Sequence, residues 1–233
     1  MESSTIYGRN PVTEALEKGL QIEKVFLQAN MHGEFEVLIR NACKKRDIPL
    51  TKVPFRKLND MSKGHIHQGI LAYISPVAYT NVVDLLPKLF EAGIVPLLVV
   101  LDGITDVRNM GAIARSAKVF GANGIVIPAK GTARISEEMV KSSAGAILDI
   151  PICRENSLPV ALETMQMNGL IVYATDINAK KTIAEQNLKG PTAIILGSED
   201  KGVSKKCIQI SDDSIKIPQV NNFDSLNVSV AAG

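Results

Sequence analysis

Apolar residues along the chain occur either in short continuous runs or at helical spacing, and the two patterns alternate. The runs PLLVVL, GIVI, LIVYA and TAIIL are apolar throughout, which is typical of parallel strands covered on both faces. These and similar runs predict strands at residues 95–101, 124–128, 147–152, 170–174, 192–197 and 214–217. Helical spacing between most of them predicts helices at 109–120, 136–144, 157–168 and 203–209. The pattern therefore predicts an α/β protein with a parallel sheet.

The first 75 residues show the same alternation on a smaller scale. NPVTEALEKG and EFEVLIRNACKKRD have helical spacing, and IEKVFLQ, LTKVP and GILAYIS predict short strands. The proline in SPVAYTN interrupts the pattern. We therefore expect a small α/β domain at 1–76, a linker with a leading helix bent at Pro87 at 77–94, and a larger domain at 95–233. The final LNVSVAAG is typical of the opening of a helix, so we expect the C-terminal helix to be incomplete.

Composition narrows the class of protein. The 233 residues are 45% apolar and 21% charged, as in globular proteins. No apolar run approaches the roughly 20 residues that span a bilayer, and the N-terminus lacks the regions of a signal peptide. Three widely spaced cysteines, Cys43, Cys153 and Cys207, suggest neither a disulfide framework nor a metal site. We expect a reduced, cytoplasmic setting and no membrane partner.

The charge is unevenly distributed, although the net charge is only +2. Residues 1–78 carry eleven Lys and Arg against eight Asp and Glu, with basic clusters in CKKRD and FRK. This distribution permits a surface that faces RNA. An ordinary solvated helix face explains the charges equally well. The two histidines of KGHIHQG, His65 and His67, have no Cys or paired acids nearby, so no metal is predicted.

Three polar loops follow predicted strands. The first, LDGITDVRNMGAIARSA, has neither the G-x-G-x-x-G nor the Walker pattern. We expect Asn109 to cap a helix, and Gly111 and Arg115 to share an exposed face with room for a phosphate. The buried side is expected at Met110, Ile113, Ala117 and Phe120. A plain cap followed by a surface arginine is the alternative.

The second loop, ILGSEDKGVS, carries Gly197, Glu199 and Gly202, which suit a close backbone approach to a ligand beside an acceptor. A tight turn with a solvated acid is the alternative. The third, KIPQVNNFDSLNVSVAAG, places Ser225 and Asn227 at a helix start, where they can cap the helix or contact a ligand.

Together the three loops resemble, in order and spacing, the motifs of the SpoU (TrmH) branch of the SPOUT RNA methyltransferases. NMGAIARSA, LGSEDKG and IPQVNNFDSLNVSVA carry the resemblance over residues 97–233, and YGRNPVTEAL and HQG resemble the small substrate-binding domain of many members. Two departures stand near the expected cofactor. Gln219 replaces a common methionine, and VNNFD replaces a loop richer in glycine.

The resemblance implies a SPOUT-type parallel sheet with a trefoil knot, a bound S-adenosyl-L-methionine, and a homodimer with the active site at the subunit interface. It implies methylation of a ribose 2′-hydroxyl, in particular of a guanosine in 23S ribosomal RNA. Arg115 would orient the RNA phosphate. The positioning residues would be Asn109, Glu199, Ser225 and Asn227, and backbone groups of Leu196, Gly197, Ile217, Gln219 and Leu226 would hold the cofactor.

Other functions stay open at this point. A transfer-RNA ribose methyltransferase of the same family is one, and an antibiotic-resistance ribosomal RNA methyltransferase is another. A non-catalytic RNA-binding protein of ribosome assembly belongs to a different class, but Asn109, Arg115 and Asn227 are all present. A dinucleotide-binding enzyme fits least, because the glycine fingerprint follows none of the strands.

Overall fold

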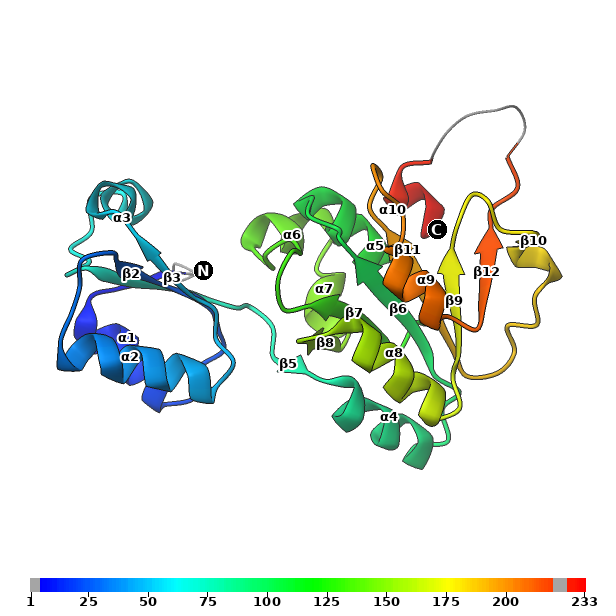
Figure 1. The fold of residues 1–233 in the computed structure, drawn as a ribbon, viewed down its shortest axis with the longest axis horizontal. Coiled ribbons are helices and arrows are strands. Elements are labelled where there is room, and N and C mark those ends of the chain that lie inside the picture. Colours follow the sequence, from blue (N-terminus) through cyan, green and yellow to red (C-terminus); the bar gives the residue numbers. More distant parts are fainter. Residues whose placement is uncertain (1–4, 220–225) are drawn as a thin grey trace. The chain divides into compact units, whose positions relative to one another are not determined.

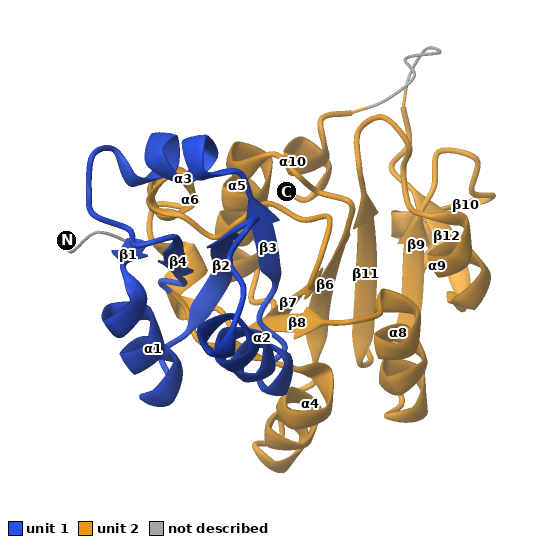
Figure 2. Ribbon diagram, turned by 60° about the vertical axis from the view of Figure 1, so that its left-hand side comes forward, with its two compact units in different colours: residues 1–76 blue, residues 77–233 orange. Residues whose placement is uncertain are grey.

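The computed structural model describes residues 5–219 and 226–233. The chain divides into two compact units, residues 1–76 and 77–233, which Figure 2 colours separately. Each unit has its own apolar clusters.

The first unit is a four-stranded mixed sheet with helices on both faces. Its strand order is β1 (Thr5–Tyr7), β4 (Ile70–Ile74), β2 (Ile22–Gln28) and β3 (Leu50–Val53), and only the β2–β3 pair is parallel. Helices α1 (Arg9–Glu17) and α2 (Glu34–Lys45) pack on one face, through residues such as Val12 and Ile39. On the other face, Leu58 of α3 (Phe55–Ser62) packs on Phe26 and Leu71. The sequence pattern did not predict α3, which offers few apolar positions.

The second unit is an eight-stranded sheet in which every neighbouring pair is parallel. Its order is β10 (Lys181–Thr182), β12 (Asp213–Lys216), β9 (Ile171–Thr175), β11 (Thr192–Gly197), β6 (Leu97–Asp102), β7 (Gly124–Pro128), β8 (Ile152–Glu155) and β5 (Tyr79–Thr80). The central strands are apolar because helices cover both faces (Figure 1). The parallel sheet predicted from these apolar runs is confirmed.

Alternate residues of each central strand belong to different helix layers. Val99 and Leu101 of β6 pack with α5 (Val107–Val119), α6 (Glu137–Ser142) and α7 (Ala146–Asp149). Leu98 and Val100 pack with α4 (Val82–Glu91), α8 (Leu158–Met167) and α9 (Lys205–Ile210). Helix α4 runs through Pro87 without an interruption.

One predicted strand is wrong. Residues 147–152 are apolar enough for a strand, but Ala146–Asp149 form the short helix α7, and β8 begins only at Ile152. Gly145, with a φ of 86°, starts this helical turn in the left-handed conformation. Pro151 separates the turn from the strand. The two-residue strands β5 and β10 carry too little pattern to be predicted.

The chain reaches its last helix, α10 (Val228–Ala231), by returning across the sheet. β12 pairs with β9, whereas Val228 of α10 packs in the same cluster as Ile113 of α5. β9 and β11 lie between β12 and β6, the strand that precedes α5. The return lies between Lys216 and Val228. The trefoil knot depends on the course of the chain through residues 220–225, outside the described residues, and stays a prediction.

Candidate active site at the carboxyl ends of β6, β11 and β12

The first loop is organised by Asp106 rather than by Asn109. The Asp106 side chain accepts hydrogen bonds from the backbone N–H groups of Arg108 and Asn109, at 2.9 and 2.8 Å, and caps α5. The expectation that Asn109 caps the helix is therefore wrong. An acidic residue just before the apolar helical pattern is a known start signal, and it could have identified Asp106. Since Asn109 lies inside the first turn, its amide is available for another partner.

Three side chains that are far apart in sequence form one hydrogen-bonded cluster. Asn109 Nδ2 donates to Glu199 Oε1 at 3.0 Å. Asn227 Nδ2 donates to Asn109 Oδ1 at 3.1 Å and also to Glu199 Oε1. We call this group the Asn109–Glu199–Asn227 cluster. It joins one residue from each of the three loops. Glu199 and Asn227 are exposed and Asn109 is partly exposed, so the cluster is within reach of a ligand.

Asn227 also starts α10, because its Oδ1 accepts a hydrogen bond from the Ser229 backbone N–H at 3.0 Å. The other predicted residue of this loop, Ser225, lies outside the described residues.

The second loop is tightly folded back on β11. A Cβ added at Gly197 would lie 2.0 Å from the carbonyl carbon of Gly202, so only glycine fits. The Gly202 N–H donates to the Ser198 carbonyl at 2.8 Å, and Gly202 has a φ of 65°. The Asp102 carboxylate at the end of β6 accepts the Ser204 N–H at 2.8 Å and fastens the far side of the loop. The sequence pattern did not single out Asp102, because an acid at the end of a strand is the only signal it gives.

Gly111 serves helix packing and not phosphate binding. It is buried, and an added Cβ would lie 1.9 Å from Ser142 Oγ and 3.2 Å from the Met139 carbonyl. The absence of a side chain therefore lets α5 and α6 approach each other, and the expected exposed face with room above Gly111 is wrong. Phe120, expected to be buried, is 63% exposed, whereas Met110, Ile113 and Ala117 are buried as expected.

Arg115 is exposed and is not part of the cluster. It follows Asn109 by six residues on α5, so it lies about 9 Å farther along the helix axis and about 120° around it. Within the part of the chain that the structure describes, Arg115 forms no ion pair and no side-chain hydrogen bond. The guanidinium is thus available for a phosphate.

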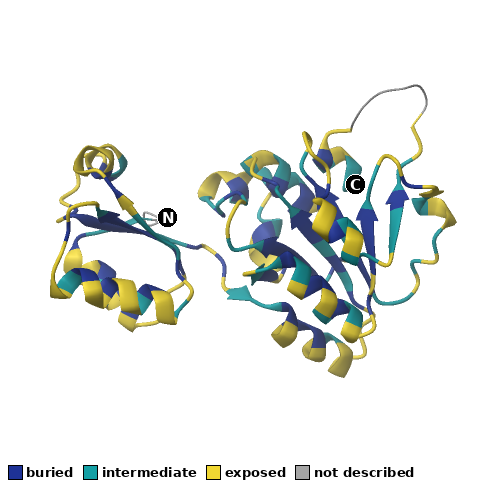
Figure 3. Cartoon of the chain, in the orientation of Figure 1, coloured by how far each residue is buried: buried dark blue, intermediate teal, exposed yellow. Residues whose placement is uncertain are grey.

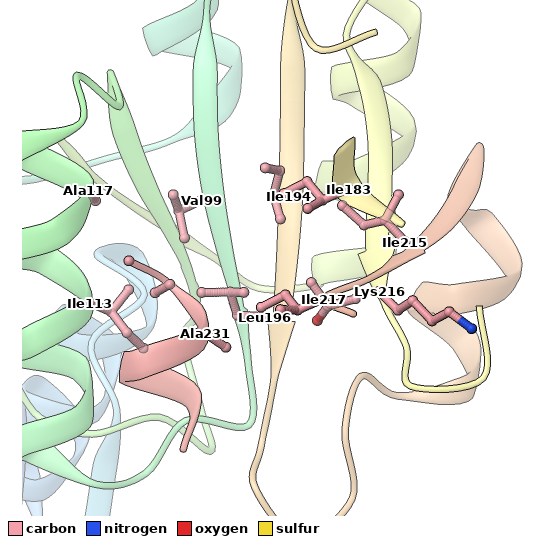
Figure 4. Close-up of a pocket in the computed structure, with 13 residues that line it drawn as sticks. Val99, Ile113, Ala117, Ile183, Ile194, Leu196, Ile215, Lys216, Ile217 and Ala231 are labelled. Carbon is pink, nitrogen blue, oxygen red and sulfur yellow. The ribbon is translucent and has the colours of Figure 1, made fainter. Parts of the chain in front are cut away.

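Beside the cluster lies an apolar cavity of about 180 Å³ (Figure 4). Two residues expected at the cofactor, Leu196 and Ile217, line it. The rest of the wall comes from β6, α5, β9, β11 and β12, from Ile183, and from residues 231–233. Thr175 and Lys216 are the polar residues of the lining, and Figure 4 shows the Lys216 ammonium extending away from the others. Gln219 and Leu226, the latter 40% exposed, do not line this cavity.

The residues present fit a nucleoside cofactor. The cavity is smaller than the roughly 300–1,000 Å³ of a pocket for a complete ligand of drug size. It offers apolar walls for a flat base, and Leu196 in its wall is followed by Gly197, where the backbone of the second loop packs directly on β11. A polar tail would have to lie outside the cavity, toward the exposed cluster.

Neither a metal site nor a membrane segment is found in the described ranges. No group of three or more His, Cys, Asp or Glu side chains could hold a metal ion there. No described helix is long and apolar enough to cross a bilayer. The three cysteines are buried free thiols. Burial raises the pKa of Cys43 to about 11 and that of Cys153 to about 12, so neither thiol resembles an activated nucleophile.

Known proteins share both units. Residues 96–233 match the model of the SpoU rRNA Methylase family, and residues 5–80 match the model described as RNA 2′-O ribose methyltransferase substrate binding. A tRNA/rRNA methyltransferase of Mycobacterium avium is 36% identical over 235 residues, covering 100% of this chain and 75% of its own. The TrmH family tRNA/rRNA methyltransferase YacO of Bacillus subtilis is 34% identical over 229 residues, covering 98% and 91%.

A solved structure shows the same fold. The SpoU methyltransferase AviRb from Streptomyces viridochromogenes, in complex with AdoMet, is 20% identical, has a TM-score of 0.59, and covers 98% of this chain and 85% of its own. The α/β architecture with a parallel sheet and the three-loop site define the class, an RNA ribose methyltransferase with a SPOUT-like fold. The chain belongs to the SpoU/TrmH family of RNA 2′-O-methyltransferases and carries the substrate-binding domain of that family.

Proposed function

We propose that the chain transfers the methyl group of S-adenosyl-L-methionine to the ribose 2′-hydroxyl of a guanosine in 23S ribosomal RNA, as RlmB-type members do. The observation that carries the proposal is the Asn109–Glu199–Asn227 cluster. It joins the three family motifs beside an apolar cavity that suits a nucleoside. A cytoplasmic location belongs to the same proposal.

Bound S-adenosyl-L-methionine would supply an electrophilic methyl group on sulfur. We assign its binding to backbone groups of Leu196, Gly197, Ile217, Gln219 and Leu226. Support comes from Leu196 and Ile217 in the cavity wall and from Gly197, where any side chain is excluded. AviRb, which shares the fold, was solved with AdoMet.

The residues of the chain would position the RNA and assist loss of the 2′-hydroxyl proton. A ribose hydroxyl is a poor nucleophile, so in-line placement supplies much of the rate. We assign Arg115 to the RNA phosphate and the cluster, together with Ser225, to the target nucleotide. Arg115 is unsuitable as a base because a guanidinium keeps its proton in proteins. Deprotonation assisted by the phosphate that Arg115 holds is consistent with this role.

The separation of Arg115 from the cluster supports a homodimer. On one copy the guanidinium and the cluster occupy different faces of α5, so a single site need not use both from the same chain. A second copy can bring its own Arg115 to the cluster of the first. In such a dimer, mixing Arg115→Ala protein with Asn227→Asp protein restores activity through exchange of subunits. If the mixture exchanges subunits but stays inactive, Arg115 and the cluster act within the same chain.

The choice of ribosomal RNA rests on the first unit, because residues 5–80 match the substrate-binding model. Transfer RNA is the second candidate, since the relatives in Mycobacterium avium and Bacillus subtilis are named tRNA/rRNA methyltransferases. Both RNAs therefore belong in the first experiment.

That experiment measures transfer of labelled methyl from S-adenosyl-L-methionine to unmodified 23S RNA and to bulk transfer RNA, followed by nuclease mapping. We expect label on a guanosine 2′-oxygen of the 23S RNA, and a loss of about a hundredfold or more for Arg115→Ala. Arg40→Ala is the matched control, because Arg40 is an exposed arginine on α2 paired with Glu36.

If only transfer RNA were labelled, the proposed methyl transfer would be correct and the proposed substrate, 23S RNA, would be wrong. If Arg115→Ala turned over at the normal rate, the role of Arg115 would be wrong. If neither RNA were labelled although the protein bound S-adenosyl-L-methionine, the proposed activity on free RNA would be wrong.

A further inference from the structure

Two sequence motifs of the first unit, which are more than 50 residues apart, meet at one edge of its sheet. The backbone of Gly8 donates to the Ile70 carbonyl at 3.1 Å, and the Arg9 N–H donates to Gln68 Oε1 at 3.0 Å. The rings of Tyr7 and His65 are stacked, with centroids 4.7 Å apart and an interplanar angle of 15°. We call residues 7–9 and 63–69 the Tyr7–His65 surface.

The two histidines of this surface have different environments. His67 is buried, its Nδ1 accepts the Gly69 N–H at 3.0 Å, and its Nε2 lies 2.7 Å from Asn59 Oδ1. Both its nitrogens are therefore used inside the fold. His65 is exposed, and no side-chain hydrogen bond joins it to any residue that the structure describes. Tyr7 covers one face of the His65 ring, and the residue as a whole stays exposed.

An exposed apolar group lies directly beside this residue. Ile66 is 84% exposed, and Phe55, whose ring centroid lies 5.3 Å from that of His67, is 54% exposed. In Figure 3 most of α3 and its flanks has the colour of exposed residues, whereas the strands below it are largely buried or intermediate. Nothing in the packing of the first unit requires an isoleucine at this position. A partner with a flat apolar face would explain both Ile66 and the exposure of His65.

The charges around the surface are mostly positive. Arg56, Lys57 and Lys63 are exposed on α3 and its C-cap, with Asp60 as the acid of this segment. None of the three forms an ion pair with a residue in the described ranges, whereas Lys52 nearby in sequence pairs with Glu36 at 3.1 Å. Unpaired cations beside exposed rings are the combination that binds single-stranded nucleic acid, by phosphate contacts and by stacking of bases.

We propose that the Tyr7–His65 surface binds an unpaired nucleobase of the substrate RNA, which stacks on His65 and packs against Ile66 while Arg56, Lys57 and Lys63 hold the flanking phosphates. This inference rests on the proposed function and specifies which part of the first unit recognises RNA and in which form. The surface would prefer a loop or bulge over a continuous duplex, because only unstacked bases offer their faces.

The test measures binding of the complete chain to a single-stranded RNA oligonucleotide and to the same sequence in a duplex, by fluorescence anisotropy. We expect His65→Ala combined with Ile66→Ser to weaken single-strand binding about tenfold or more. His65→Phe retains a ring for stacking and is expected to bind nearly as the original chain does. Leu38→Ser is the matched control, since Leu38 is an exposed apolar residue on α2, outside this surface.

A second measurement tests the phosphate contacts. Changing Arg56, Lys57 and Lys63 together to Gln should reduce the slope of the logarithm of affinity against the logarithm of salt concentration by about 2. In methyl-transfer assays on the 23S transcript, the His65→Ala, Ile66→Ser protein should show a raised KM at nearly unchanged kcat. A purely structural role of these side chains would instead lower thermal stability and kcat together.

The outcomes separate the two proposals. If the original chain methylates RNA and the double variant binds and reacts equally well, the surface does not contact RNA, and a protein partner would then explain its exposed groups. If the original chain binds duplex and single-stranded RNA with equal affinity, and the double variant loses the same affinity for both, the proposal that a base stacks on His65 is wrong. If the original chain binds single strands through this surface but transfers no methyl to either RNA, the proposed activity fails while the surface assignment holds.

Discussion

Asn227 has two separable roles at the residue scale. Its Oδ1 caps α10 through the Ser229 N–H, and its Nδ2 donates to Glu199 and Asn109. Aspartate can cap a helix as well as asparagine does. It cannot donate, however, and it would bring a second carboxylate against Glu199. Asparagine is therefore the residue that satisfies both neighbours.

We predict that Asn227→Asp lowers methyl transfer about a hundredfold, because the cluster loses its shared donor and its two acids repel each other. The free energy of unfolding should change little, whereas Asn227→Ala should lose about 1 kcal/mol with the cap. Single-turnover rates and urea unfolding measure the two effects. If Asn227→Asp transferred methyl at nearly the rate of the original chain, the Asn227 amide donor would not be needed for the reaction.

The buried thiols give a second prediction. Because burial raises the pKa of Cys43 to about 11 and that of Cys153 to about 12, both are almost fully protonated at pH 8. We expect a disulfide reagent to react slowly with the folded chain and rapidly with all three thiols in guanidinium. Their raised pKa values also make a stabilising contribution that is complete below the ordinary value of 9.0 and is lost as the pH rises toward 11 and 12. Rapid labelling of the folded chain would contradict the burial.

The sequence points to the candidate site residues but not to the contacts among them. Asn109, Glu199 and Asn227 stand in motifs, so resemblance identified them. Their mutual hydrogen bonds join positions 28 to 118 residues apart, and no local pattern encodes such a contact. For the same reason the sequence predicted a helix cap at Asn109, because its hydrogen-bond partner Glu199 is distant in the sequence.

At the scale of elements, the contact of α5 with α6 depends on one missing side chain. Helical phase correctly placed Met110, Ile113 and Ala117 on a buried face. Helical phase could not show that α6 covers the face of α5 at Gly111, because the sequence of α5 does not say which helix packs on that face. The short helix α7 was not predicted either, because a buried apolar run of a few residues is compatible with both a strand and a helical turn.

We predict that Gly111→Ala destabilises the chain by about 1–3 kcal/mol, in spite of the better helix propensity of alanine. The new methyl group would meet Ser142 Oγ and the Met139 carbonyl. Adding Ser142→Gly should restore part of the loss, because Ser142 supplies the closest atoms. Urea unfolding of the single and double variants measures this coupling. If the single and double variants lost the same free energy of unfolding, the Met139 carbonyl, and not Ser142, would be the atom that excludes a side chain at position 111.

At the scale of the whole molecule, the candidate cofactor site belongs to the second unit alone. The cavity and the cluster are built from residues between Val99 and Gly233. The first unit has its own two apolar clusters and supplies none of these groups. Under the proposed assignments, separately packed parts of the chain would carry cofactor binding and RNA recognition.

Hydrogen exchange should reveal this division. At a concentration of S-adenosyl-L-methionine about 100 times its Kd, the bound state gains about 2.7 kcal/mol. We expect slower exchange in α5, β11 and β12, and unchanged exchange in residues 5–76. Protection of β2 or β4 by the cofactor would show that the units unfold together. Mass spectrometry of peptic fragments resolves the two units.

The return of the chain from β12 to α10 also constrains the order of folding. β9 and β11 lie between β12 and β6 in the sheet, whereas Val228 of α10 packs in the same cluster as Ile113 of α5, so we expect those strands to pair before α10 docks. Contacts of such long sequence separation form slowly. Asn227, which completes the cluster, therefore arrives last. In refolding from urea, helical and sheet content should therefore recover well before cofactor binding, and a chain caught between the two stages would have its sheet but no working site.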